Sequence, residues 1–268
     1  MIEPVVDAEW VRANHDRVIL ADVRAYLDGR KGRDAYDAGH LPGAIFVDLD
    51  ADLAAAPSAA DGRHPLPDPE RFAERMSALG VGDDATVIAY DDAGGVMAAR
   101  LVWMLRASGR SAALLDGGLD AYGTERETGA PKRDHAVFTP RPWPAARLAD
   151  LADTIAGGSV VIDARQPERF RGETEPIDPR AGHIPGARNV PCRENVDATG
   201  RFLPAAQLRE RFEAAGVTGD ADVISYCGSG VTACHNLLAL ERAGFGPGRL
   251  YPGSWSQYSA TDRPAATS

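Results

Sequence analysis

Residues 38–49 read AGHLPGAIFVDL, and residues 181–192 read AGHIPGARNVPC. Both segments carry the same run of glycine, histidine and proline, so that His40 in the first corresponds to His183 in the second. Each follows a short β-rich run that ends in aspartate, VILAD in the first case and VVID in the second. A pattern that recurs in this way indicates an internal repeat, so the chain contains two copies of one structural unit.

The second half of each copy supports the repeat. The stretch DDATVIAYDDAGGVMAARLVWMLRASG at 83–109 matches DADVISYCGSGVTACHNLLALERAG at 220–244. Tyr90 corresponds to Tyr226 at an offset of 136 residues, and Gly117 corresponds to Gly253 at the same offset. The repeat therefore extends over both halves of each copy.

The length of the chain suits a division into two domains. A chain of 268 residues can form two domains of about 130 residues, each with its own core. Residues 127–145 hold four prolines and few apolar residues in any period, which is typical of an extended linker. We therefore predict an N-terminal domain at 1–126, a linker at 127–145 and a C-terminal domain at 146–268.

The order of local patterns predicts the fold of each domain. Runs such as VVID, DVISY and RLYPG favour strands, and they alternate with helical patterns such as TACHNLLALERAG. This alternation predicts an α/β fold, with two tandem domains that each have a mainly parallel sheet flanked by helices. Gly109 and Gly244 follow predicted helices, as expected of helix C-caps. Functional groups should lie at the carboxyl ends of the strands, where loops lead into helices.

The composition excludes several classes of partner. The formal net charge is -10 and no long basic run occurs, so nucleic acid is not an expected partner. No apolar run approaches the ~20 residues that span a bilayer, and the N-terminus is acidic where a signal peptide carries positive charge. We therefore expect a cytoplasmic protein with no membrane partner. The three cysteines are too irregularly spaced for a disulfide framework or a zinc site, and neither a metal nor another cofactor is predicted.

Cys227 is the predicted nucleophile. It follows the strand pattern DVISY and opens the loop CGSGVT, which leads into a helix. Backbone N–H groups in a glycine-rich turn, together with the dipole of the following helix, favour thiolate over thiol at the centre of such a loop. Gly228 and Gly230 allow the backbone to curl around the sulfur. Cys192 and Cys234 lack this context, so we assign them to packing or passive exposure, which is the commoner role of a cysteine taken alone.

Several motifs together carry a family resemblance. The loop CGSGVTA, the paired GHLPGA and GHIPGA segments and the terminal YPGSWSQY resemble the tandem-domain rhodaneses over nearly the whole chain. In that family the C-terminal copy alone is catalytic and carries sulfur as a persulfide. The resemblance implies the same here, because Asp91 stands at the position that corresponds to Cys227. The loop itself resembles that of the 3-mercaptopyruvate sulfurtransferases, whereas thiosulfate-preferring members carry two basic residues after the cysteine.

The chemistry of the donor agrees with that comparison. Thiosulfate is a dianion that gains from cations beside the nucleophile, and Gly228 and Ser229 supply none. Mercaptopyruvate leaves as pyruvate enolate, so its site must remove the thiol proton, stabilise negative charge and deliver a proton. By resemblance, Ser229 is the proton relay and is paired with His64 in RHPLP and Asp50 in FVDLD, in a site that straddles both domains. The alternatives are an exposed loop histidine and a helix-capping aspartate.

A donor carboxylate requires cationic contacts, and the planar fork of arginine binds it bidentately. By resemblance, the segment RFRGETEPIDPR supplies the substrate arginines Arg169 and Arg180. This segment is slightly longer than the family pattern, so that Arg171 can exchange roles with Arg169. A solvated surface arginine is the alternative for each. The loop residues expected to contact the donor are Gly228, Gly230, Val231 and Thr232.

His40 and His183 recur at the same point of both copies. This recurrence favours a structural role, with Asp22 and Asp163 as their hydrogen-bond partners.

Other functions receive less support. A cysteine phosphatase needs an arginine at the position that Ala233 occupies. A noncatalytic module that binds or senses a persulfide need not retain Ser229, His64 and Asp50. Within the enzyme class, thiosulfate sulfurtransferase is the runner-up. The acceptor stays open among thioredoxin, a low-molecular-weight thiol and cyanide.

Overall fold

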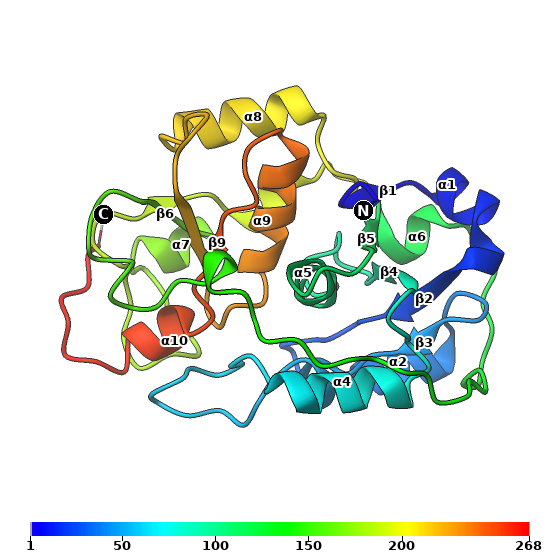
Figure 1. Ribbon diagram of the computed structural model, residues 1–268. Helices are drawn as coiled ribbons and strands as arrows, with labels where there is room; N and C mark the ends of the chain where they lie inside the picture. The colour runs from blue at the N-terminus through cyan, green and yellow to red at the C-terminus, as the bar shows by residue number, and fades with distance from the viewer. Residues whose placement is uncertain (1, 268) are drawn as a thin grey trace. The chain divides into compact units, whose positions relative to one another are not determined.

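The computed structural model describes residues 2–267 and divides into two compact units. Unit 1 comprises Met1–Ala55, Pro67–Trp143 and Ala198–Phe202. Unit 2 comprises Ala56–Leu66, Pro144–Asp197 and Leu203–Ser268. Figure 1 traces the elements of each unit along the chain.

Unit 1 is built on a parallel sheet in the order β1-β5-β4-β2-β3. Its strands are β1 (Val5–Val6), β2 (Val18–Asp22), β3 (Ile45–Phe46), β4 (Thr86–Tyr90) and β5 (Ala112–Leu115). Its helices are α1 (Ala8–Ala13), α2 (Gly32–Ala38), α3 (Leu49–Asp52), α4 (Pro69–Ala78), α5 (Ala99–Ala107) and α6 (Gly118–Ala121), with a 3-10 turn η1 (His15–Arg17). The predicted strand VILAD is β2 without a change of bounds.

Unit 2 repeats this plan with a parallel sheet in the order β7-β6-β8-β9. Its strands are β6 (Val160–Asp163), β7 (Arg188–Asn189), β8 (Val223–Tyr226) and β9 (Arg249–Leu250). Its helices are α7 (Pro167–Phe170), α8 (Ala205–Ala214), α9 (Ala233–Arg242) and α10 (Ser254–Tyr258), with 3-10 turns η2 (Ala145–Arg147) and η3 (Cys192–Asn195). Both units thus confirm the predicted α/β fold class, although the run RLYPG yields a strand of two residues only.

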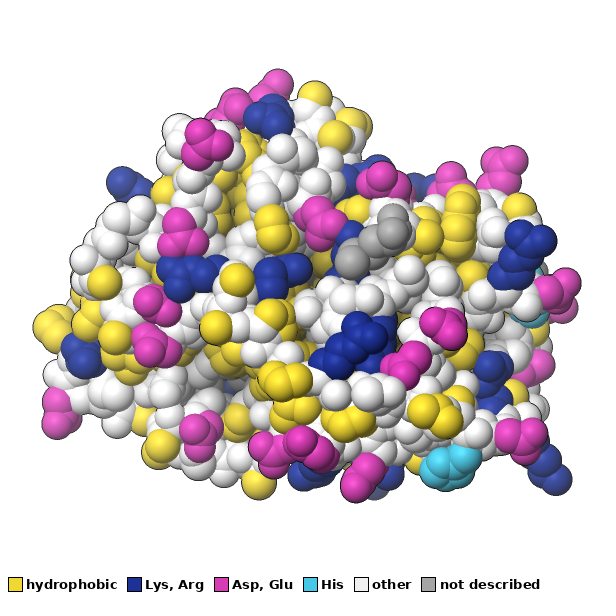
Figure 2. All heavy atoms as spheres, in the orientation of Figure 1, with side chains coloured by type: hydrophobic (Ala, Val, Ile, Leu, Met, Phe, Trp, Pro, Cys, Tyr) yellow, Lys and Arg dark blue, Asp and Glu magenta, His cyan; other side chains and the backbone are white. Residues whose placement is uncertain are grey.

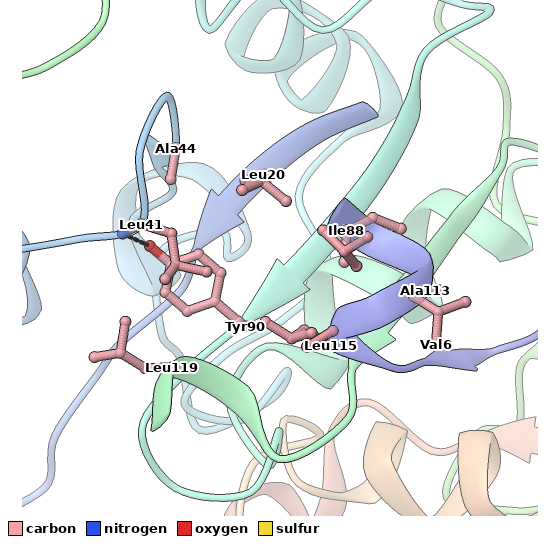
Figure 3. Close-up of a cluster of buried hydrophobic side chains, with 11 residues drawn as sticks. Val6, Leu20, Leu41, Ala44, Ile88, Tyr90, Ala113, Leu115 and Leu119 are labelled. Carbon is pink, nitrogen blue, oxygen red and sulfur yellow. Dashed lines mark hydrogen bonds between the residues drawn. The ribbon is translucent and has the colours of Figure 1, made fainter. Parts of the chain in front are cut away.

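The core of unit 1 shows why the strands read as apolar runs. Leu20 of β2 and Ile88 of β4 are buried in one cluster with Tyr90, which Figure 3 shows in close-up. The Tyr90 hydroxyl accepts a hydrogen bond from the Leu41 backbone N–H at 3.0 Å. In unit 2 the Tyr226 hydroxyl accepts from the Ile184 N–H at 3.2 Å. The GH(L/I)PGA motif is therefore tied to the sheet in the same way in both copies.

The aspartates that end β2 and β6 bind arginine, which corrects the partners expected for the two histidines. Arg24 donates to Asp22 at 2.7 Å, and Arg165 donates to Asp163 at 2.7 Å. Each arginine follows its aspartate by two residues, so its guanidinium folds back onto the carboxylate at the end of the strand. The prediction that Asp22 and Asp163 bond to histidine is wrong for this reason.

Each histidine instead contacts the helix that precedes its motif, α2 for His40 and α7 for His183. His40 Nδ1 donates to the Tyr36 carbonyl at 2.8 Å, and His183 Nδ1 lies 2.8 Å from the Phe170 carbonyl. Each imidazole also stacks on the ring of the same residue, with 3.7 Å between centroids in both cases. Both histidines are buried, and these contacts support the predicted structural role.

Glycines end the two matching helices as predicted. Gly109 follows α5 with φ 78°, and Gly244 follows α9 with φ 81°. Each donates its N–H to a carbonyl in the last turn of the helix. This left-handed conformation is open to glycine at little cost, which explains its place just after the C-cap residue.

Two short segments, called arms here, belong to a different compact unit from the residues on either side of them in the sequence. The arm at 56–66 comes from the first copy but belongs to unit 2, and the arm at 198–202 comes from the second copy but belongs to unit 1. Their sequences correspond, with Gly62-Arg63-His64 in one and Gly200-Arg201-Phe202 in the other. Gly62 and Gly200 both have positive φ, at 88° and 76°. The arms are therefore part of the repeat, and the units differ there from a division at 127–145.

The surface carries charges of both signs. On the face that Figure 2 shows, acidic side chains are interspersed with lysine and arginine. None of the helices between residues 2 and 267 combines the length and apolar character that a bilayer crossing requires. Nor do those residues include three His, Cys, Asp or Glu side chains grouped to hold a metal ion.

Candidate active site

Cys227 stands directly after β8, at the carboxyl end of a central strand of unit 2, as predicted. The first peptides of its loop are held by the start of α10. The Cys227 carbonyl accepts from the Trp255 N–H at 3.0 Å, and the Gly228 carbonyl accepts from the Ser256 N–H at 2.8 Å. The Cys227 side chain is buried within this clamp.

Ser254 completes the clamp in a strained conformation. Among residues 2–267 it is the one non-glycine residue with positive φ, at 52°. Its hydroxyl accepts from the Cys227 N–H at 3.1 Å and donates to the Tyr251 carbonyl at 2.9 Å. The matching residue of unit 1 is Gly118, with φ 59°. A side chain retained where the copy has glycine indicates a function at this position.

The matching loop of unit 1 shows what such a loop binds. Asp91, at the position of the cysteine, is buried, and its carboxyl oxygens accept four backbone hydrogen bonds. The donors are Ala93 at 2.8 Å, Gly95 at 2.7 Å, Met97 at 2.8 Å and Ala98 at 3.0 Å. Burial raises the pKa of Asp91, and the four N–H groups oppose that shift. A loop of this sequence pattern therefore directs several N–H groups at one acceptor.

The unit 2 loop corresponds to this loop in sequence, with Cys227 at the position of Asp91. By position, the N–H groups of Ser229, Val231, Ala233 and Cys234 match the four donors to Asp91, and the Cys234 N–H is hydrogen-bonded to the Val231 carbonyl at 3.1 Å. Gly230 has φ 76°, and a Cβ at this residue would lie 2.5 Å from the Pro252 carbonyl oxygen. Glycine is therefore required at position 230, because any side chain would be strained and would collide with backbone.

The structure brings His64 to the cysteine loop. His64 Nδ1 lies 2.7 Å from Ser229 Oγ, which is within hydrogen-bonding distance. Both residues belong to unit 2, because His64 is part of the arm at 56–66. A buried serine hydroxyl next to an imidazole can pass a proton in either direction.

Asp50 belongs to unit 1, whereas His64 and Ser229 belong to unit 2. It is the second residue of α3 in unit 1 and its side chain is exposed. The N-cap of α3 is Asp48, whose side chain accepts from the Asp50 and Ala51 N–H groups at 2.9 Å. Helix capping, the alternative considered for Asp50, therefore belongs to its neighbour.

Two guanidinium groups lie over Gly228. A Cβ placed on Gly228 would be 3.1 Å from Arg63 Nη2 and 3.7 Å from Arg169 Nη1. Two cationic side chains thus lie beside the Cys227 loop, although the residues that follow Cys227 in the sequence are uncharged. Sequence reasoning found Arg169 but missed Arg63. The signal was available, since Arg63 precedes His64 and corresponds to Arg201 in the second copy.

Buried carboxylates hold these arginines. Asp178 is paired with Arg63 and lies 3.3 Å from Arg169 Nη2. Glu175 accepts from Arg169 at 2.5 Å and from Arg165 at 3.2 Å. Burial raises the pKa of Asp178, while the charge of Arg63 opposes that shift. Neither carboxylate was singled out from the sequence, although Arg169, which contacts both, lies on the same segment.

The other two arginines of the segment have different surroundings. Arg171 is exposed and pairs with Glu173 at 2.7 Å. Arg180 donates to three backbone carbonyls around the end of α10, namely Ser259 at 2.9 Å, Arg263 at 2.9 Å and Tyr258 at 3.2 Å. Of the three, Arg169 is the one that the structure places over the cysteine loop.

The remaining cysteines are buried in packing positions. Cys234 Sγ lies 3.4 Å from the Gly230 carbonyl, inside the first turn of α9. Burial raises the pKa of Cys192 to about 12, and the nearby Cys227 adds to that shift. A thiol with so high a pKa is a poor nucleophile at neutral pH. Both environments support the assignment of these cysteines to packing.

Comparison with known proteins identifies the family. A model of the rhodanese-like domain matches residues 7–125 and again residues 147–261. The chain belongs to the rhodanese-like family. The two matches confirm the resemblance and the tandem repeat that the sequence predicted.

Relatives of this rhodanese-like protein are similar over nearly its whole length. It is 44% identical to a Pseudomonas aeruginosa protein named "Probable 3-mercaptopyruvate sulfurtransferase", over 96% of this chain and 94% of that protein. It is 32% identical to "Thiosulfate/3-mercaptopyruvate sulfurtransferase 2" of Arabidopsis thaliana, over 96% of this chain and 84% of that one. The crystal structure of SseA from Escherichia coli, a 3-mercaptopyruvate sulfotransferase, matches with a TM-score of 0.84 and 34% identity, over 95% of this chain and 100% of that one.

Proposed function

We propose that this protein is a sulfurtransferase that moves sulfur from 3-mercaptopyruvate onto Cys227 and then to a thiol or cyanide acceptor. The observation that carries the proposal is the His64–Ser229 pair, 2.7 Å apart, on the loop of Cys227. A donor that leaves as an enolate needs a proton relay of this kind, whereas thiosulfate does not. The names of relatives in Pseudomonas aeruginosa and Arabidopsis thaliana support the same activity.

The first half-reaction forms the persulfide. The Cys227 thiolate attacks the sulfur of mercaptopyruvate, an S–S bond forms, and the C–S bond breaks with its electron pair moving to the pyruvate enolate. Ser229 and His64 carry the proton of the donor thiol to the enolate carbon, which gives pyruvate. The loop N–H groups stabilise the negative charge on the outer sulfur of the persulfide.

Contacts to the donor follow from the position of each group. Arg63 and Arg169 bind the donor carboxylate above Gly228, since a guanidinium matches a carboxylate bidentately. The backbone of Gly230, Val231 and Thr232 encloses the reacting sulfur. Arg180, proposed from the resemblance as a donor contact, has its nitrogens on backbone carbonyls, which supports a role in positioning α10. The role of Asp50 as the partner of His64 rests on the resemblance alone.

The second half-reaction returns the cysteine to its starting state. An acceptor thiol attacks the outer sulfur, the S–S bond to Cys227 breaks, and the acceptor leaves as a persulfide while Cys227 regains its thiolate. Cyanide would leave as thiocyanate by the same bond exchange.

Thioredoxin as the acceptor and a cytoplasmic location stay predictions from the sequence. We also propose that 1–126 and 146–268 are the two copies and that 127–145 joins them, which the family matches at 7–125 and 147–261 support.

Thiosulfate sulfurtransferase is the second candidate. The guanidinium groups of Arg63 and Arg169 beside the loop favour an anionic donor of either kind, and the name of the Arabidopsis thaliana relative includes both donors.

The test is a paired donor assay on the purified protein. Pyruvate release from mercaptopyruvate with a thiol acceptor is compared with thiocyanate formation from thiosulfate and cyanide. We expect the higher kcat/KM with mercaptopyruvate. A clear preference for thiosulfate would favour the second candidate. Formation of neither product would favour the alternative that the protein is a noncatalytic module that binds a persulfide.

A further inference from the structure

The arginines over the cysteine loop belong to a charge cluster with no net charge. The cluster consists of Arg63, Arg165, Arg169, Asp163, Glu175 and Asp178. Three guanidinium groups face three carboxylates, and each carboxylate side chain is at most 3% exposed. Their charges therefore cancel, and little solvent screens the carboxylates from the arginines.

Asp178 holds the central place in this cluster. One of its oxygens pairs with Arg63 of the arm, and the other lies 3.3 Å from Arg169 Nη2. Asp163 binds Arg165 at the end of β6, and Glu175 joins Arg165 to Arg169. Of the three carboxylates in this cluster, Asp178 is the one that contacts both of the arginines that lie over Gly228.

The charge of the cluster matters because the two candidate donors differ in charge. Mercaptopyruvate carries one negative charge at neutral pH, on its carboxylate, and thiosulfate carries two. A buried negative charge next to the binding arginines repels every anionic donor, and it repels a dianion about twice as strongly as a monoanion. The carboxylate of Asp178 therefore lowers the affinity for the dianion more than the affinity for the monoanion.

We propose that Asp178 is a specificity-determining residue, which keeps the two donor-binding arginines in place and selects a monoanionic donor over a dianionic one. This inference rests on the proposed function and explains how a site with two cations beside the nucleophile still prefers mercaptopyruvate. Asp178 acts through Arg63 and Arg169 and is a positioning residue, not a catalytic one. The selection acts mainly on KM, because charge repulsion weakens binding of the donor before any bond is broken.

The experiment measures kcat/KM for both donors in Asp178→Asn. Asparagine has nearly the same shape and removes one negative charge. We expect the ratio of kcat/KM for thiosulfate to that for mercaptopyruvate to rise about tenfold, since one buried charge close to the donor changes its binding by that order. The rise should come from a lower KM for thiosulfate.

Two controls separate this effect from general damage or net charge. Glu173→Gln removes the same charge from an exposed residue that pairs with Arg171, and it should leave the ratio unchanged. Asp178→Glu keeps the charge, and it should keep the ratio near that of the wild type even where overall activity falls. Should Asp178→Asn fail to fold, Glu175→Gln removes the neighbouring charge of the same cluster and is expected to shift the ratio in the same direction.

The outcomes are distinct from those that test the function itself. An unchanged ratio in both Asp178→Asn and Glu175→Gln, with a wild type that prefers mercaptopyruvate, overturns the inference and leaves the proposed function intact. A ratio that moves toward mercaptopyruvate overturns it as well. A wild-type protein that uses neither donor overturns both proposals together.

Discussion

The strained Ser254 offers the sharpest test of how the fold holds Cys227, the proposed nucleophile. Ser254 has φ 52° and accepts the Cys227 N–H at 3.1 Å. Replacing it by alanine removes the hydroxyl but keeps the strain, and replacing it by glycine removes both. The pair of variants therefore separates the hydrogen bond from the backbone conformation.

The magnitudes can be worked out for each variant. Loss of the hydroxyl leaves the buried Cys227 N–H without this acceptor, which costs about 1–3 kcal/mol of unfolding free energy. A left-handed conformation costs a residue with a side chain about 1–2 kcal/mol, and glycine escapes this cost. Glycine in turn loses about 0.5–1 kcal/mol through the greater freedom of the unfolded chain. Ser254→Ala should thus be less stable than wild type. The free energy of unfolding of Ser254→Gly should be roughly 0.5–1 kcal/mol higher than that of Ser254→Ala.

Urea unfolding followed by tryptophan fluorescence measures these differences, because Trp255 is buried in α10 of unit 2 and reports on the site. The rate of persulfide formation is measured on the same samples. Both variants should lose rate to a similar extent, although their stabilities differ, because both lose the anchor of the Cys227 N–H. Wild-type rates in Ser254→Gly, or an alanine variant more stable than the glycine variant, would refute the reasoning.

Three further predictions concern the nucleophile, the relay and acid stability. Cys227→Ser should abolish persulfide formation, and Cys234→Ser should leave it nearly intact. Mass spectrometry after donor treatment should therefore find one added sulfur (about 32 Da) on the peptide with Cys227. The same added mass on the Cys192 peptide would contradict the assignment. His64→Ala should slow turnover of mercaptopyruvate more than that of thiosulfate in steady-state assays, and equal losses would count against a proton relay. Asp83 accepts hydrogen bonds from Thr139 and Arg110, which lower its pKa to about 2 from the usual 3.8. The folded state therefore favours the ionised carboxylate, so Asp83→Asn should have a lower Tm than wild type above pH 4. The difference in Tm should shrink as the pH falls from about 4 toward 2. A difference in Tm that stays as large at pH 2 would contradict this account.

Much of the fold could be read from local pattern. The repeat of VILAD and VVID, the GH(L/I)PGA motif and the helical spacing after each loop predicted two parallel α/β copies. The position of Cys227 between a strand and a helix followed from the same pattern. These features depend on residues that are neighbours along the chain, where periodicity and glycine placement reflect backbone conformation directly.

Partner choice among charged side chains could not be read in this way. The histidines His40 and His183 were expected to bind Asp22 and Asp163, but each aspartate is taken by an arginine two residues further along. The sequence contains both an arginine and a histidine that could bind each aspartate. Whether the arginine or the histidine binds the aspartate depends on the direction in which each side chain points, and packing sets this direction.

The sequence by itself determined the two parallel sheets, their loops and the place of Cys227 at the end of a central strand, because each rests on patterns within a few residues. Only the tertiary structure decided that Arg63 stands over Gly228, that Asp178 holds it and that Arg180 turns to backbone carbonyls. Arg63 and Asp178 are 115 residues apart, and His64 and Ser229 are 165 apart. Contacts over such separations leave no periodic trace, since they arise when an arm of one copy packs into the unit built mainly from the other.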